Sequence, residues 1–205
     1  MEPFTRHTGV VMPLDRADVD TDLIVPARFL KRIERTGYGE TLFFTLRFRP
    51  DGTPLPDSPF AKPEYQGATV LVAGPNFGCG SSREHAAWAL HDYGFRVVVA
   101  SSFANIFAAN AAQNGLLTIV LPEPRVRQML ETASTREGYQ LTVDLERQTV
   151  TDGFGREDRF EIDPFTKHRL LNGLDAIGLT LQAREDIARF EASRPGWMPR
   201  VTAGE

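Results

Sequence analysis

The sequence predicts an α/β fold built around a parallel sheet. Three short apolar runs, at residues 68–72, 96–100 and 116–121, have the length and the β-branched composition of buried strands. Two segments of helical length, 82–93 and 101–114, separate them. Such alternation is typical of parallel α/β structure, and right-handed crossovers bring the loops that follow the strands to one edge of the sheet.

Turn residues mark the ends of these elements. An earlier strand, predicted at 10–12, ends at Pro13, and the third apolar run ends at Pro122. Gly94 stands in the position that commonly follows a helix, and Gly115 ends the second helix in the same way. The elements of the α/β core are therefore short and closely spaced.

The last third of the chain changes character. Residues 140–145 and 148–151 have the pattern of two antiparallel strands joined by a short turn. Residues 163–171 and 184–193 have the pattern of helices, and the Asn172-Gly173 pair ends the first of them.

Two segments are expected to lie outside the packed elements. The first, 28–35, is basic and leads into a glycine-containing turn at 36–39. The second, 52–63, contains four prolines and is expected to form a loop or an arm rather than a packed element. The length of 205 residues fits one domain carrying both segments.

The composition excludes several classes of protein. Lysine and arginine total 23 against 27 aspartates and glutamates, without the basic stripe of a nucleic-acid-binding protein. No apolar run is long enough to span a membrane, and the polar N-terminus lacks the apolar core of a signal peptide. The single cysteine, Cys79, rules out a disulfide within the chain and favours the reducing cytoplasm.

The segment that carries the chemistry is 76–85, between a predicted strand and a predicted helix. Gly78 and Gly80 allow sharp turns, and the helix start offers unpaired N–H groups with partial positive charge. Ser81, Ser82 and Arg83 add hydroxyl groups and a guanidinium that can bind a carboxylate. These features predict a site for an organic anion.

The same residues also allow interpretations in which they serve the fold and bind no ligand. Ser81 followed by Glu84 is also the spacing of a capping box, in which the serine only begins the helix. Cys79 could be a nucleophile near a helix start, but a packing role is favoured. The aspartates of 18–22 do not match the pattern of a calcium-binding loop and instead fit a turn. The four histidines form no recognisable metal-binding motif, so no metal site is predicted.

Several motifs, in the same order, resemble one family. Residues 80–86 resemble the signature of the mobile C-terminal domain of aconitase-type hydro-lyases, and Asp20-Thr21-Asp22 with Ile24 and Pro26 resembles that domain's N-terminal motif. Residues 76–90, 35–39 and 172–181 resemble the small subunits of 3-isopropylmalate dehydratases. The resemblance runs from about residue 4 to about residue 198, with one departure at Ala87, where many relatives carry proline.

The resemblance implies a fold, a partner and a reaction. The fold is a swivelling three-layer β/β/α domain spanning 1–205, with a mobile substrate loop near 28–39 and the proline-rich arm near 52–63. The chain would bind no cofactor itself but would cap a large subunit that holds a [4Fe–4S] cluster. Together they would interconvert the dicarboxylates 2-isopropylmalate and 3-isopropylmalate through 2-isopropylmaleate, a step of leucine biosynthesis.

The resemblance also assigns roles to residues. Ser81 matches the serine whose deprotonated oxygen removes a proton from carbon. Gly80, Ser82, Arg83 and Asp22 match positions that bind the substrate or line its site. Substrate choice is expected in the loop near 28–39, from the residues Phe29, Leu30, Lys31, Arg32, Ile33 and Thr36. The apolar members suit an isopropyl group, whereas Arg28, Lys31 or Arg32 could instead bind a carboxylate.

Other functions stay open at this point. A related hydro-lyase acting on citraconate or methylmalate, homoaconitate or dimethylmaleate would share Ser81 and differ in the pocket loop. A non-catalytic module that binds organic anions would also lack cluster cysteines, but would need no base. A purely structural α/β domain leaves the glycine-serine loop unexplained.

Overall fold

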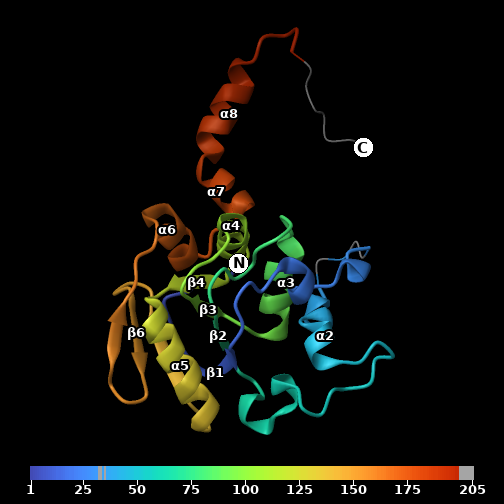
Figure 1. The fold of residues 1–205 in the computed structure, drawn as a ribbon. Helices are drawn as coiled ribbons and strands as arrows, with labels where there is room; N and C mark the ends of the chain where they lie inside the picture. The colour runs from blue at the N-terminus through green and yellow to red at the C-terminus, as the bar shows by residue number, and fades with distance from the viewer. Residues whose placement is uncertain (32–33, 35, 199–205) are drawn as a thin grey trace.

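The computed structural model describes residues 1–31, 34 and 36–198, whose strands form one seven-stranded sheet in the order β4-β3-β2-β1-β5-β6-β7 (Figure 1). Four parallel strands make one half: β1 (Arg6–Leu14), β2 (Val70–Ala73), β3 (Val97–Ala100) and β4 (Leu117–Val120). Three antiparallel strands continue it: β5 (Gln140–Asp144), β6 (Thr149–Asp152) and β7 (Glu157–Arg159). The predicted α/β class is confirmed.

Eight α-helices and four 3-10 turns lie in the described residues. The α-helices are α1 (Thr21–Ile24), α2 (Phe44–Arg47), α3 (Glu84–Tyr93), α4 (Asn105–Gln113), α5 (Glu123–Thr135), α6 (Pro164–Asn172), α7 (Ala176–Gln182) and α8 (Arg184–Ser193). The 3-10 turns are η1 (Ala27–Phe29), η2 (Tyr38–Thr41), η3 (Pro59–Ala61) and η4 (Pro63–Tyr65). The sequence predicted α3, α4, α6 and α8, whereas α1, α2, α5 and α7 were not predicted.

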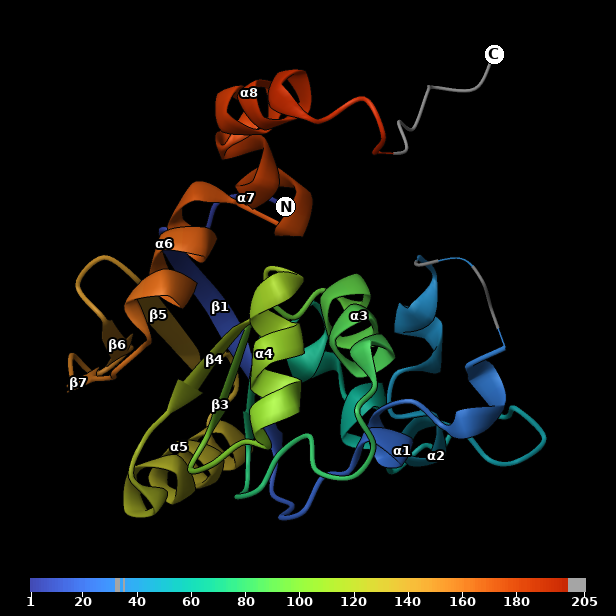
Figure 2. The same cartoon turned by 90° about the horizontal axis from the view of Figure 1, so that it is seen from above.

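The sheet separates two apolar cores. Side chains alternate across a strand, so Leu71 and Ala73 of β2 pack in the core that contains α3, whereas Val70 and Val72 pack in the core that contains α5. In Figure 2, α3 and α4 lie side by side over the parallel strands. The sheet curls so that β5 and β6 also pack into the core of α5.

The expectation that the first strand ends at Pro13 is wrong, because β1 continues to Leu14. The N–H of Val11 donates to Tyr139 O on the β5 side of the strand, and the backbone nitrogen of Pro13, two residues later, faces the same side. The pairing with β5 does not extend beyond Val10, so the proline removes no hydrogen bond of the ladder.

The expectation that 52–63 is unpacked is wrong at its C-terminal end. Ser58 is buried, and its side chain caps η3, which begins at Pro59, by accepting a hydrogen bond from the backbone N–H of Phe60. The Phe60 ring is buried against Phe43 and Tyr93. Burial of this one aromatic ring fixes the end of the arm, while residues 52–54 are exposed.

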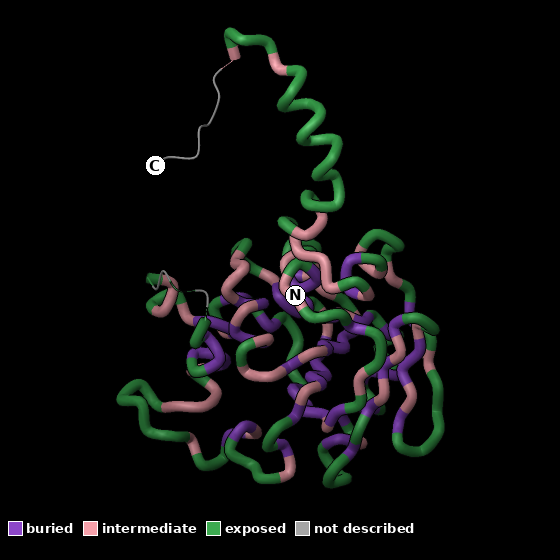
Figure 3. Tube along the Cα trace, turned by 180° about the vertical axis from the view of Figure 1, so that it is seen from behind, coloured by how far each residue is buried: buried purple, intermediate pink, exposed green. Residues whose placement is uncertain are grey.

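The last two helices project from the rest of the chain (Figure 1). No residue of α7 or α8 is buried, and Figure 3 shows α8 exposed along its length. Within the described part of the chain, no helix is long and apolar enough to cross a membrane.

Candidate active site

Two loops at the carboxyl ends of β1 and β2 pair with each other, and they carry the two motifs that the sequence singled out. The N–H of Asp18 donates to Pro75 O at 2.9 Å, that of Gly78 to Val19 O at 2.7 Å, and that of Thr21 to Cys79 O at 2.9 Å. The prediction that loops after the strands meet at one sheet edge is therefore confirmed for these two segments.

The loop after β3 supports the other side of the same segment. The N–H of Phe77 donates to Ser102 O at 3.1 Å, and the N–H of Ala104 donates to Phe77 O at 3.0 Å. The backbone N–H of Asn76 donates to Ser102 Oγ at 2.8 Å. Phe77 itself is buried, so the loop is fixed by hydrogen bonds to the loops after β1 and β3 and by a side chain in the core.

The two glycines of the loop are required for different reasons. Gly78 has a φ of +77°, and a β-carbon there would collide with the ring of Phe107. Gly80 has a φ of +89°, but a β-carbon added there would make only ordinary van der Waals contacts, the nearest atom being 3.5 Å away. The left-handed conformation alone therefore favours glycine at position 80.

The capping-box interpretation of Ser81 and Glu84 is wrong. Helix α3 begins at Glu84 rather than at the predicted residue 82, and its cap residue Arg83 is extended, with a φ of −118° and a ψ of 110°. Neither Ser81 nor Ser82 forms a side-chain hydrogen bond within the part of the chain that the structure describes, and both are exposed. Their hydroxyl groups precede the positive end of α3.

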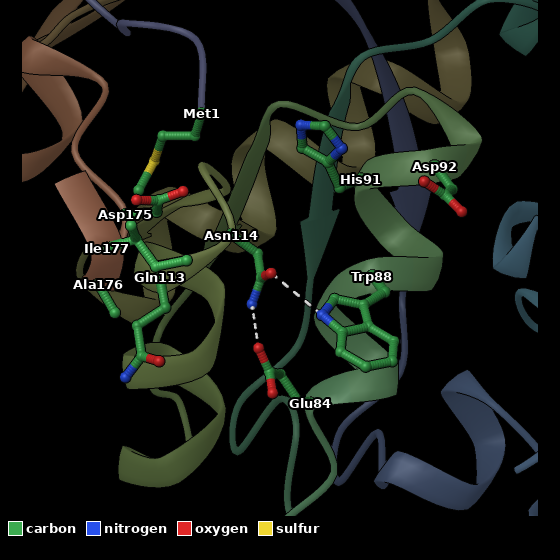
Figure 4. Close-up of a pocket in the computed structure, with 10 residues that line it drawn as sticks. All are labelled: Met1, Glu84, Trp88, His91, Asp92, Gln113, Asn114, Asp175, Ala176 and Ile177. Atoms are coloured by element: carbon green, nitrogen blue, oxygen red, sulfur yellow. Dashed lines mark hydrogen bonds between the residues drawn. The ribbon is translucent and has the colours of Figure 1, made fainter. Parts of the chain in front are cut away.

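Glu84 is held instead by an asparagine from the end of α4 (Figure 4). Asn114 Nδ2 donates to Glu84 Oε1 at 3.1 Å, and Asn114 Oδ1 accepts from Trp88 Nε1 at 3.0 Å. Because both Glu84 and Trp88 belong to α3, one side chain fixes the first turn of that helix against α4. Sequence reasoning missed Asn114, since 30 residues separate it from Glu84.

The N-terminal motif orients the same tripeptide. Thr21 Oγ1 donates to Ser81 O at 3.0 Å, and Arg83 forms an ion pair with Asp22 at 2.5 Å. The hydrogen bond from Arg83 holds the pKa of the Asp22 carboxyl below its usual value, so the carboxylate stays charged beside the guanidinium. The structure thus brings together four predicted site residues, Asp22, Ser81, Ser82 and Arg83, with Gly80 next to them.

Cys79 lies in this loop, but its surroundings do not activate it. Burial raises the pKa of the thiol, and the carboxylates of Asp20 and Asp18 raise it further. A nucleophilic or metal-binding cysteine needs the thiolate, which these surroundings disfavour. No group of three or more histidine, cysteine or acidic side chains in the described residues could hold a metal ion.

The predicted specificity residues lie on a segment that follows the motif containing Asp22. Phe29 and Leu30 are half-buried, and Lys31 and Thr36 are exposed. Arg32 and Ile33 lie outside the described residues. Among the described residues, no hydrogen bond, ion pair or ring contact joins Phe29, Leu30, Lys31 or Thr36 to 80–83.

Both ends of this segment are anchored in the fold. At the first end, Phe29 packs against Phe44, and the Arg28 guanidinium lies over both rings, 4.8 and 4.5 Å from their centroids. At the second end, the backbone N–H of the buried Tyr38 donates to Asp92 Oδ2 of α3 at 3.0 Å. The aromatic contacts hold Arg28 at the base of the segment.

His85 packs behind the loop, against two aromatic rings. Its ring lies 5.2 Å from that of Tyr38 and 4.7 Å from that of Trp88. Burial lowers the pKa of His85, which favours the neutral imidazole. Its buried Nδ1 has no hydrogen-bond partner in the described residues.

The chain is similar to known proteins over most of its length. Three family models match the chain: the aconitase C-terminal domain over 1–124, the model described as LeuD_N over 127–164, and the C-terminal domain of the 3-isopropylmalate dehydratase small subunit over 177–203. The crystal structure of a 3-isopropylmalate dehydratase from Methanocaldococcus jannaschii superposes with a TM-score of 0.63 at 26% identity, covering 91% of this chain and 99% of that one.

Curated relatives are similar over nearly the whole length. The 3-isopropylmalate dehydratase small subunit of Bacillus licheniformis is 52% identical and covers 97% of this chain and 99% of its own. Those of Brevibacillus brevis and Rubrobacter xylanophilus are 54% and 56% identical, covering 95% and 98% of this chain and 100% of their own. The chain belongs to the family of 3-isopropylmalate dehydratase small subunits.

Proposed function

We propose that this chain completes a two-subunit hydro-lyase that interconverts 2-isopropylmalate and 3-isopropylmalate through 2-isopropylmaleate. The observation that carries the proposal is the Ser81-Ser82-Arg83 tripeptide, whose serine hydroxyl groups make no hydrogen bond to other described residues and whose guanidinium is fixed by Asp22. A carboxylate bound there would face hydroxyl, guanidinium and helix N–H groups at once. Membership of the family supplies the reaction.

Arg83 binds a substrate carboxylate and is oriented for that task by Asp22. The ion pair uses one terminal nitrogen, Nη1, so Nη2 keeps its donors for the ligand. Ser82 adds a hydroxyl donor to the same carboxylate, and the Gly80 amide adds a backbone donor. The substrate is thereby held with its carbon-bound proton toward Ser81.

Ser81 Oγ, as an alkoxide, takes that proton from carbon, and the hydroxyl group on the neighbouring carbon leaves as water after receiving a second proton from a general acid on the large subunit. An unassisted serine is a weak base, so its oxygen anion needs stabilisation by the amides of the glycine loop and the positive end of α3. Re-addition of water to the other carbon, with the proton returned by Ser81, completes the interconversion.

The [4Fe–4S] cluster expected for this reaction is proposed to reside on the large subunit. Such a cluster is held by several cysteine thiolates, and the chain has one cysteine, whose thiol has a raised pKa. When bound, the cluster supplies a Lewis acid for the substrate hydroxyl and carboxylate. The cytoplasm, where a lone thiol stays reduced, is proposed as the site of the reaction.

Substrate choice is proposed to lie in the segment of Phe29, Leu30, Lys31, Arg32, Ile33 and Thr36. This segment directly follows the N-terminal motif that holds Asp22, and Phe29 and Leu30 supply apolar surface for an isopropyl group. Arg28 is engaged by two aromatic rings, which makes it the weakest of the three cations as a carboxylate ligand.

Anaerobic reconstitution tests the proposal. The chain is mixed with a candidate large subunit holding an intact cluster, and the absorbance of the enoic intermediate is followed with each isopropylmalate isomer. Turnover that requires both subunits is expected. Turnover of citraconate or homoaconitate alone would reassign the substrate, and a bound, cluster-loaded complex that is silent with every substrate would contradict a catalytic role.

A further inference from the structure

The C-terminal arm, defined here as α7, α8 and Trp197, presents large apolar side chains to solvent. Their exposed fractions run from 37% to 79% for Ile177, Leu181, Ile187, Phe190 and Trp197. Neither helix contributes a buried residue. Single exposed apolar residues need no explanation, but five within 21 positions of the sequence mark a surface that a partner covers.

The spacing of these residues gives each helix one apolar face. Ile177 and Leu181 are four residues apart on α7, and Ile187 and Phe190 are three apart on α8. Charged side chains occupy other faces of α8, where Arg189 and Asp186 form an exposed ion pair at 3.1 Å. Every residue of α8 is exposed, and an amphipathic helix with no cover from its own chain suits a groove on another chain.

We propose that the C-terminal arm docks onto the large subunit of the hydro-lyase, an inference that rests on the proposed function. The model of the aconitase C-terminal domain, by its description a domain within a longer chain, matches only 1–124. A separate model, described as the C-terminal domain of the small subunit, matches 177–203, and this range contains all five apolar residues. A domain that is a separate chain needs an attachment that a covalently linked domain does not.

The base of the arm lies near the candidate active site. Ile177 lines a cavity of about 340 Å³ between α3, α4 and α7 (Figure 4). Glu84, which directly follows the Ser81-Ser82-Arg83 tripeptide, lines the same cavity. A subunit that brings its cluster to Ser81 therefore borders this cavity, and the arm extends the contact from there.

The double variant Leu181→Asp and Phe190→Asp tests this docking. Both side chains are about 60% exposed, so the isolated full-length chain should keep its melting temperature. The dissociation constant for the cluster-loaded large subunit should rise at least tenfold, measured by analytical ultracentrifugation. Glu185→Lys is the matched control, because residue 185 lies two positions from Ile187 and faces away from it.

The outcomes separate this inference from the proposed function. If the wild-type chain binds no large subunit, the proposed function fails first. If wild type and double variant bind equally well, the docking role of the arm is refuted. If the isolated wild-type chain is a dimer that the double variant converts to a monomer, the arm serves a second copy of the chain, and the inference is overturned.

Discussion

We infer that the hydrogen bond from Asn114 to Glu84 sets the start of α3 at Glu84. If Asn114 is replaced by aspartate, Trp88 keeps its acceptor but Glu84 loses its donor and can bond back to the N–H of Ser81, as in a capping box. We expect kcat to fall about 10- to 100-fold, because a displaced Ser81 no longer meets the reacting carbon. Steady-state kinetics of the reconstituted enzyme measures this.

A second substitution shows whether Asn114 positions Ser81 or only stabilises the packing of α3 against α4. Adding Glu84→Ala to Asn114→Asp removes the competing cap, so activity should recover relative to the single variant. A double variant no better than Asn114→Asp would show that Asn114 merely holds α3 and α4 together. The melting temperature of each variant provides the control for folding.

The loop glycines give a matched pair of stability predictions. Gly78→Ala combines a left-handed φ with a collision against Phe107 and should lower the free energy of unfolding by more than about 2 kcal/mol. Gly80→Ala meets only the conformational cost, about 1 kcal/mol. Chemical denaturation of the two variants measures the difference, and equal losses would contradict a steric role for Phe107.

At the residue scale, the sequence predicted the tripeptide and Asp22 but not what holds them in place. The glycines and serines identify an anion site because their chemistry is local. Whether Glu84 closes a capping box or leaves the tripeptide unbonded depends on Asn114, which is distant in sequence. The local spacing of Ser81 and Glu84 is compatible with both arrangements, so it could not exclude the capping box.

At the scale of elements, Arg125 joins α5 to the antiparallel strands. Its side chain is 5% exposed and donates to Asp152 at 3.0 Å and to Asp158 at 2.5 Å. Arg125→Ala leaves the buried Asp152 unpaired and should cost about 3–5 kcal/mol of unfolding free energy. Arg127→Ala, which breaks an exposed pair with Glu123, should change it by less than about 0.5 kcal/mol.

The same cluster predicts a dependence on pH. Burial opposes the charge of Asp152, but hydrogen bonds from Arg125 and from backbone N–H groups outweigh it and hold the pKa below the ordinary 3.8. Stability from this group is therefore present above pH 3.8 and is lost as the pH falls through the lower folded pKa. Thermal melts of Arg125→Ala should show a weaker loss in that acid range; an unchanged profile would exclude Asp152 as its source.

Elements were predictable where the pattern was local. The strands at 97–100 and 117–120 were found from β-branched runs, and α3 from the glycine after it. Helix α5 was missed although Val126, Met129, Leu130 and Ala133 have helical spacing and are buried. The extent of β1 beyond Pro13 could not be predicted, since it depends on where β5 leaves the sheet.

At the scale of the whole molecule, the curled sheet has a core of mainly structural residues on one face and the candidate active site at one edge. Antiparallel strands and α5 close one core, while the carboxyl ends of β1, β2 and β3 present the paired loops. The family and the sheet-edge location of the site follow from sequence. Full assembly does not, because the proposed large subunit and its cluster would lie in another chain.

The role proposed for Ser81 is removal of the proton from carbon, and the variant Ser81→Ala in the reconstituted enzyme is its sharpest test. The side chain is exposed, so folding and binding to the large subunit should be unchanged. We predict a loss of at least about 10³-fold in kcat, with KM little altered because Arg83 still binds the carboxylate. Turnover within tenfold of wild type, in a complex with an intact cluster, would rule out Ser81 as the base.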